Sequence, residues 1–105
     1  MKIGQVMKAL SHPIRRDIVS RLRERPMSAG DLAAHYDVSK PTMSAHFAAL
    51  RDAELLIAQR EGVSILYRLN MTVMEEALGA MMSLLSSGED AKHLANEPSD
   101  EQAPA

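Results

Sequence analysis

The segment of residues 27–56, MSAGDLAAHYDVSKPTMSAHFAALRDAELL, constrains the fold more than any other part of the chain. Ser28 stands three residues before Asp31, so its hydroxyl can accept from the free amides of a first helical turn, and the carboxylate favours the positive end of the helix dipole. This spacing predicts a helix over about residues 29–36. Residues 37–39 then form a turn before a second helix. Two short helices joined by a tight turn predict a helix-turn-helix.

The second helix, predicted over residues 40–53, separates an apolar stripe from a polar face. Val38 in the turn is expected to point inward and lock the two helices together, and Pro41 fits the first helical turn, where no amide is needed. The stripe consists of Met43, Phe47 and Leu50. Small polar side chains on such a helix can reach base edges in the major groove of DNA, and Lys and Arg can neutralise phosphates. We therefore expect DNA contacts from Ser39, Lys40, Thr42, Ser44, Ala45, His46 and Arg51.

The same helix face allows a plainer interpretation. Thr42, Ser44 and His46 could form a solvated surface without a ligand. A histidine beside an apolar stripe also often packs as a structural residue, which leaves two roles open for His46. Ala45 is small enough to permit close approach to a thymine methyl group.

A β-hairpin is predicted directly after the helix-turn-helix. Two short β-like runs, 57–61 and 64–69, flank Gly62, and apolar residues alternate with polar ones in the second run. The hairpin over 57–69 would form a wing beside the second helix. Its expected DNA-contacting residues are Gln59, Arg60 and Arg68, although the arginines could also be ordinary surface charges. Arg60, near the tip, is the candidate for the minor groove or a flanking phosphate.

Amphipathic helices are predicted at both ends of this unit. Residues 3–10 carry apolar side chains at helical spacing, a further helix starts near Pro13, and Thr72 with Glu75 forms a capping box for a last helix that ends near Ser86. The fold class is therefore mainly α with a small β-hairpin. The apolar faces of the first and last helices exceed what one small domain can cover, which predicts a dimer interface of Ile3, Val6, Met7, Leu10, Met74, Leu78, Met81 and Leu85. A soft pocket for an apolar ligand is the alternative interpretation of the methionines.

Composition and charge divide the chain into two parts. The net charge is −2, but residues 1–86 hold 11 Lys and Arg against 9 Asp and Glu, whereas 87–105 hold five acidic residues and one lysine. We expect one domain over 1–86 and a disordered acidic tail over 87–105. No apolar run is long enough for a membrane span and no signal-peptide pattern is present, so we expect a cytoplasmic protein.

Three segments together resemble a known family. The chain resembles the ArsR/SmtB family of winged-helix repressors in the segments ALSHPIRRDIVSRLRERPMSAGDLA and DVSKPTMSAHFAALRDAELL and in the hairpin that ends in ILYRL. The wording of the second segment is most similar to the SdpR-type autorepressor branch. The resemblance implies a homodimer that binds an inverted-repeat operator in double-stranded DNA, with the first and last helices at the dimer interface. It also implies that a membrane protein partner can relieve repression.

Departures from the family pattern concern the sensor sites. Ser28 and Gly30 stand where metal-sensing members carry a Cys-x-Cys pair, and the chain has no cysteine at all. The last helix has neither His nor Asp, and the four histidines are too scattered to gather on one element. We therefore expect no metal and no cofactor.

Two other classes of function, an enzyme and a protein-interaction module, are less consistent with the sequence. No nucleophile–base arrangement or phosphate loop is present, which argues against an enzyme. A winged-helix dimer that acts as a protein-interaction module is the remaining alternative. Lys40 and Arg51 favour DNA, because loss of DNA binding would be expected to remove the basic residues of this helix.

Overall fold

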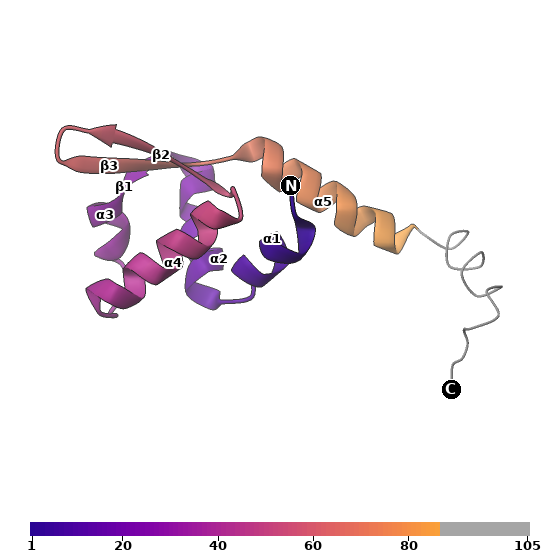
Figure 1. Cartoon of the computed structure of the whole chain (residues 1–105), viewed down its shortest axis with the longest axis horizontal. Helices are drawn as coiled ribbons and strands as arrows, with labels where there is room; N and C mark the ends of the chain where they lie inside the picture. Colours follow the sequence, from indigo (N-terminus) through magenta and orange to yellow (C-terminus); the bar gives the residue numbers. More distant parts are fainter. Residues whose placement is uncertain (87–105) are drawn as a thin grey trace.

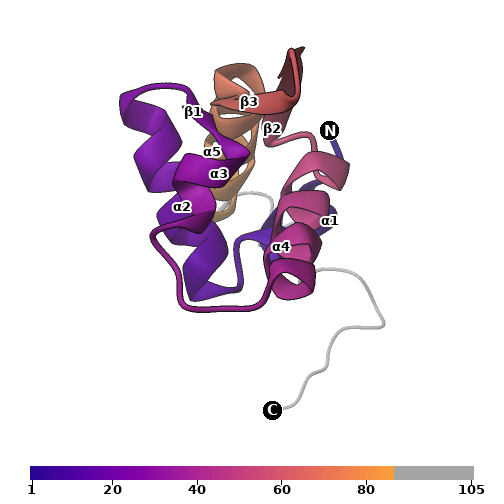
Figure 2. The same ribbon diagram turned by 90° about the vertical axis from the view of Figure 1, so that its left-hand side faces the viewer.

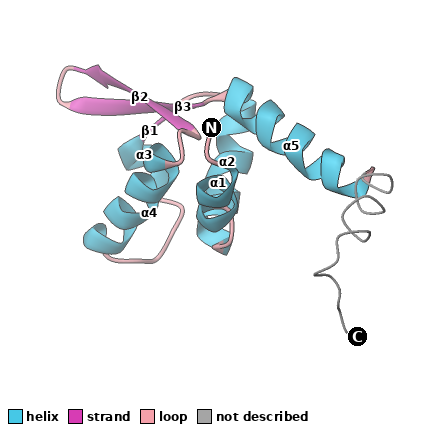
Figure 3. Cartoon of the chain, turned by 45° about the vertical axis from the view of Figure 1, so that its right-hand side comes forward, coloured by secondary structure: helices cyan, strands magenta, loops and turns pink. Residues whose placement is uncertain are grey.

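The computed structural model describes residues 1–86, so the predicted disordered tail over 87–105 lies outside the described residues. The chain forms α1 (Ile3–Ala9), α2 (Pro13–Glu24), β1 (Met27–Ser28), α3 (Ala29–Ala33), α4 (Lys40–Asp52), β2 (Leu56–Glu61), β3 (Ser64–Leu69) and α5 (Met71–Leu85). Helices α1 to α4 gather in one body, and the β2–β3 hairpin and α5 project from its opposite ends (Figures 1 and 3). The predicted fold class, mainly α with a small hairpin, is confirmed.

The strands form a small antiparallel sheet in the order β1-β3-β2. Strands β2 and β3 pair from Leu56 opposite Leu69 to Glu61 opposite Ser64, which confirms the predicted hairpin. Gly62 lies in the tight turn with φ of 62°, a backbone conformation that costs glycine little because it has no Cβ. Strand β1 was not predicted, since two residues are too few to display an alternating pattern.

The core lies between the helices and the inner face of the sheet. Both α3 and α4 lie below the hairpin in Figure 2. The predicted stripe of α4 is buried, and Phe47 packs against Tyr67 of β3 with ring centroids 4.8 Å apart. Other fully buried side chains are Ile18, Leu32, Leu50 and Leu55. Helix α4 is therefore fixed along its apolar side, and its polar side is left free beside the hairpin.

Serine caps set the start of both helices of the helix-turn-helix. The Ser28 side chain accepts a hydrogen bond from the Asp31 amide at 3.0 Å, and Ser39 accepts one from the Thr42 amide at 3.2 Å. Both predicted N-caps are thus confirmed. Helix α3 ends at Ala33, three residues earlier than predicted, and turns lead on to α4.

Two local predictions are wrong. Val38 is exposed rather than inward-pointing, because the connection that follows the short α3 runs over the surface. Helix α5 begins one residue before Thr72, and the side chain of Asn70 accepts from the Val73 amide at 3.3 Å. The cap is therefore Asn70, and the predicted capping box of Thr72 and Glu75 does not form.

A left-handed residue ends α4. Glu54 has φ of 64°, its amide donates to the Arg51 carbonyl at 2.8 Å, and the Leu55 amide donates to the Leu50 carbonyl at 2.9 Å. This pair of bonds is the Schellman arrangement, in which glycine usually takes the left-handed position. A glutamate there carries the steric cost that a Cβ imposes, about 1 kcal/mol.

Helices α1 and α5 expose apolar side chains. Val73 and Ala77 are the buried residues of α5, whereas Leu85 near its end is 82% exposed. A hollow of about 340 Å³ between α1 and α5 is lined by Ile3, Gly4, Met7, Ala80, Met81 and Leu84. Within residues 1–86 no helix has both the length and the apolar character to cross a membrane.

The predicted dimer-interface residues do not all lie on this exposed surface. Val6 is only 1% exposed, because it faces the core of its own chain, so its assignment to a dimer surface is wrong. Leu10 and Met74 are partly buried and pack against that core. The exposed members of the predicted set are Ile3, Met7, Leu78, Met81 and Leu85.

Candidate nucleic-acid interface

The N-terminal half of α4 presents a polar surface. Ser39, Lys40, Thr42, Ser44 and Ala45 are all exposed. Besides capping the helix, the Ser39 hydroxyl donates to the Thr42 Oγ1 atom at 2.9 Å. Because Thr42 Oγ1 is the acceptor in that bond, its own hydrogen stays available for an outside acceptor. The first turn of α4 thus holds Thr42 in a fixed orientation with a free donor.

His46 does not belong to this surface. Its side chain is only 5% exposed, and its Nδ1 atom accepts a hydrogen bond from Arg15 Nε of α2 at 3.1 Å. The ring also lies 4.4 Å from the ring of His12, centroid to centroid. The expected position of His46 on the DNA-facing surface is therefore wrong, and the structural alternative describes it. Its position three residues after Met43 and four before Leu50 is the signal that places it on the buried side.

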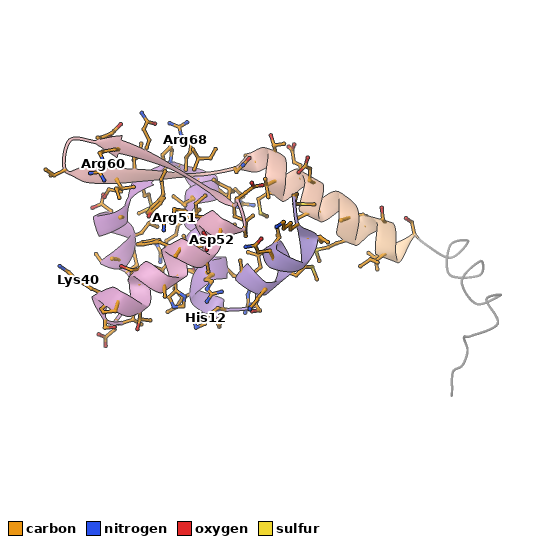
Figure 4. All side chains as sticks on the ribbon, in the orientation of Figure 1. His12, Lys40, Arg51, Asp52, Arg60 and Arg68 are labelled. Atoms are coloured by element: carbon orange, nitrogen blue, oxygen red, sulfur yellow. The ribbon has the colours of Figure 1, made fainter. Side chains whose placement is uncertain are left out.

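The register of the hairpin divides the predicted wing residues between two faces. Arg60 lies opposite Ile65, and Ile65 shares a sheet face with Tyr67, which packs on α4. Gln59 and Arg68 belong to the other face, since side chains alternate along a strand. Figure 4 shows Arg68 on the side of the hairpin away from α4. Arg60 is thus the predicted wing residue on the α4 side.

A groove of about 420 Å³ separates α3, α4 and the hairpin. Met43, Phe47 and Tyr67 contribute to its apolar lining, and Lys40 and Arg51 from the two ends of α4 also line it. Figure 4 shows Arg51 between α4 and the hairpin. Two cations along an open groove can neutralise phosphates of a strand that crosses from helix to wing.

A polar cluster ties the end of α3 to α2. The Tyr36 hydroxyl donates to Asp17 Oδ2 at 2.6 Å, Arg21 Nε donates to the same oxygen at 2.8 Å, and the Arg21 guanidinium carbon lies 5.9 Å from the centre of the Tyr36 ring. The hydrogen bonds from Tyr36 and Arg21 lower the pKa of Asp17. Burial, and then the bond to Asp17, raises the pKa of Tyr36 to about 12. Of this cluster, sequence reasoning could have found only the i,i+4 pair of Asp17 and Arg21.

Metal-ligating side chains do not converge in the part of the chain that the structure describes. Over residues 1–86 no group of three or more His, Asp or Glu side chains could hold a metal ion. His12 and His46 are neighbours, but their Nδ1 atoms accept hydrogen bonds from the Ile14 amide and from Arg15. Absence of a metal response stays a prediction that solution measurements must test.

Comparison with known proteins places the chain. Residues 10–59 match a family model described as a helix-turn-helix domain. Over 88 residues the chain is 38% identical to the transcriptional repressor SdpR of Bacillus subtilis. The aligned segment covers 84% of this chain and 98% of that protein. The chain belongs to the ArsR/SmtB family.

Other members of the family agree. The arsenical resistance operon repressor of Staphylococcus xylosus is 35% identical over 69 residues, or 66% of each chain. An ArsR-like regulator from Rhodococcus has the same fold, with a TM-score of 0.73, 21% identity and coverage of 95% of this chain and 94% of that one. The predicted resemblance, including its SdpR type, is confirmed. The chain is a DNA-binding transcriptional repressor of the ArsR/SmtB family and not an enzyme.

Proposed function

We propose that this repressor acts as a homodimer on an inverted-repeat operator, which it reads with the exposed face of α4 and grips with the β2–β3 hairpin. Thr42, Ser44 and Ala45 are the residues assigned to base edges. Lys40, Arg51 and Arg60 are assigned to phosphates, and Ser39 supports Thr42 through its hydrogen bond. Gln59 and Arg68, on the far face of the hairpin, are assigned at most peripheral contacts.

One observation carries this proposal. Lys40, Ser44 and Arg51 of α4 line the groove together with Ile65 of the hairpin. Arg60 lies opposite Ile65, on the same face of the sheet. When a recognition helix lies in the major groove, the phosphates at the edge of that groove run beside the helix, next to the hairpin. The placement of cations along that path supports simultaneous contact by helix and wing.

The exposed apolar side chains of α1 and α5 support the dimer. Leu78, Met81 and Leu85 extend along α5, and Ile3 and Met7 of α1 line or flank the hollow next to it. Contiguous apolar surface of this kind typically marks a protein–protein contact. A second copy would cover it with the same surface, as two-fold symmetry requires. Release by a membrane protein partner, or by an apolar ligand, stays a prediction from the sequence.

A gel-shift titration with the DNA upstream of the chain's own coding sequence tests this proposal. We expect a discrete complex with that duplex that survives an excess of random-sequence competitor at moderate salt. Sedimentation of the same complex should give two protein chains per duplex. Equal affinity for operator and random duplexes, or a complex with one protein chain, would contradict the proposal. Micromolar zinc, copper(I), nickel or arsenite should leave the titration unchanged.

A further inference from the structure

The central turn of α4 is anchored to α2 by two imidazole rings. His12 precedes α2, and its Nδ1 atom accepts from the Ile14 amide at 3.1 Å as the N-cap of that helix. His46 in α4 accepts through its own Nδ1 atom from Arg15 Nε, also at 3.1 Å. The two rings are 4.4 Å apart with an interplanar angle of 54°. One small cluster thus joins the start of α2 to the middle of the recognition helix.

Both hydrogen bonds require an unprotonated Nδ1 atom. An imidazolium ring carries hydrogen on both nitrogens and can accept no hydrogen bond. A proton on His46 would therefore remove the acceptor for Arg15, and one on His12 would remove the cap of α2. It would also place a positive charge beside the guanidinium of Arg15 and beside the other imidazole ring.

Within residues 1–86, the charged groups that act on His46 are His12 and Arg15, and neither is a carboxylate. From α2 His46 faces Arg15, and from the N-cap of that helix it faces His12. Arg15 also lines a hollow together with Lys8 of α1 and Asp52 of α4. Burial, followed by the charges of His12 and Arg15, lowers the pKa of His46 below its ordinary value of 6.5. His46 is thus neutral at pH 7.5, and its protonation requires a pH below 6.5.

We infer that His46 is a positioning residue for operator binding. Its neutral ring, hydrogen-bonded to Arg15 and adjacent to His12, orients α4. Protonation of that ring breaks the hydrogen bond and releases α4. The inference rests on the proposed operator contact by α4. Acidification usually strengthens DNA binding, because exposed histidines gain positive charge next to phosphates. Weaker operator binding at low pH is therefore diagnostic of the buried cluster.

The test compares three proteins by fluorescence anisotropy with the upstream duplex at pH 7.5 and pH 5.5, at constant ionic strength. Wild type is expected to lose roughly fivefold in affinity at the lower pH, because one proton on a group whose pKa lies below 6.5 costs less than about tenfold at that pH. In His46→Asn the amide oxygen branches from Cγ as Nδ1 does, so it can accept from Arg15 without titrating. That variant should bind at pH 7.5 and lose less than about threefold at pH 5.5. The matched control His35→Asn should follow the wild type.

A second measurement does not depend on a variant that folds. In the NMR spectrum of wild type, the Arg15 Nε–H resonance should shift or broaden between pH 7.5 and pH 5.5, while His46 titrates below 6.5. Operator affinity that is the same at both pH values, or a loss in His46→Asn equal to that of wild type, would overturn the inference. An Arg15 Nε–H resonance that is the same at both pH values would also overturn the inference. Absence of specific binding at pH 7.5 would instead overturn the proposed function and, with it, this role for His46.

Discussion

The Tyr36 hydroxyl donates a hydrogen bond of 2.6 Å to Asp17 Oδ2, and this contact joins the turn that follows α3 to the middle of α2. The two residues are 19 positions apart, so the bond closes the loop that contains the first half of the helix-turn-helix. Arg21 binds the same carboxylate oxygen from the next turn of α2. The orientation of α3 therefore depends on side chains as well as on its short backbone.

Tyr36→Phe should destabilise the fold by about 0.5 kcal/mol, the low end of the usual net value of one hydrogen bond, because Asp17 is half exposed. Because Tyr36 lowers the pKa of Asp17, its contribution is present above pH 3.8 and is lost as the pH falls through the lower folded value. Urea unfolding at pH 7 and near pH 3 measures both. A difference between the proteins that does not shrink in acid would contradict the assigned partner.

Thr42→Ala should reduce the preference for operator over random duplex by about 1–3 kcal/mol, as expected for a lost base contact. The helix cap should survive, because Ser39 still accepts from the backbone amide of residue 42. Thr42→Ser keeps the hydroxyl and serves as the matched control. Competition titrations with both duplexes measure the preference. If Thr42→Ala weakens both duplexes equally, Thr42 contacts phosphate rather than bases.

Arg60→Ala should weaken binding to every sequence and lower the salt slope by about one unit, the signature of one lost phosphate contact. Arg68→Ala removes the same charge from the opposite face of the hairpin and is the control. Its salt slope should change less. Titrations at several salt concentrations decide between them. Equal slopes for the two variants would mean that the hairpin acts only through its overall charge.

Met81→Glu should produce monomers, because a charge buried at an apolar interface is strongly unfavourable. Met81 is half exposed on α5, so its replacement should leave the fold of one chain intact. Val63→Glu provides the control, since Val63 at the tip of the hairpin is 99% exposed and far from α5. Analytical ultracentrifugation gives the mass of each variant. An unchanged dimer in Met81→Glu would refute the role of α5.

Glu54→Gly should stabilise the protein by about 0.5–1 kcal/mol, because glycine takes the left-handed conformation without the clash of a Cβ, which outweighs its greater freedom in the unfolded chain. Asp52→Gly, placed two residues earlier inside α4, should instead destabilise it by about the same amount. Thermal unfolding of the two variants provides the comparison. A lower melting temperature for Glu54→Gly would mean that the Glu54 side chain makes a stabilising contact in solution.

Much of the fold follows from local patterns in the sequence. Ser28 and Ser39 set the starts of α3 and α4 through bonds to amides three residues on, and local geometry alone determines such caps. The hairpin could be predicted because Gly62 separates two β-like runs. The sequence does not single out Asn70 as the cap of α5, because Thr72 and Glu75 match an equally good capping pattern.

The candidate site was harder to predict, because it depends on which side of each element faces the core. His46 is polar, yet it occupies a buried position because Arg15 and His12 satisfy and surround its ring from another helix. Val6 and Met7 are both apolar, and the packing of α1 against α4 and α5 buries the first and leaves the second exposed. The division of Arg60 and Arg68 between two faces follows from strand alternation, once the register is known.

Asn70 alone separates the last residue of β3 from the first residue of α5. Its amide also donates to the Leu55 carbonyl at 2.8 Å, so this connection is bonded to the residue just before β2. The connection between the hairpin and α5 is therefore short and hydrogen-bonded, which leaves little freedom between the two elements. A tilt of α5 is therefore expected to move the tip of the hairpin, unless the hydrogen bond between Asn70 and Leu55 breaks. Inserting a flexible residue next to Asn70 is expected to let α5 and the hairpin move independently while each of them stays folded.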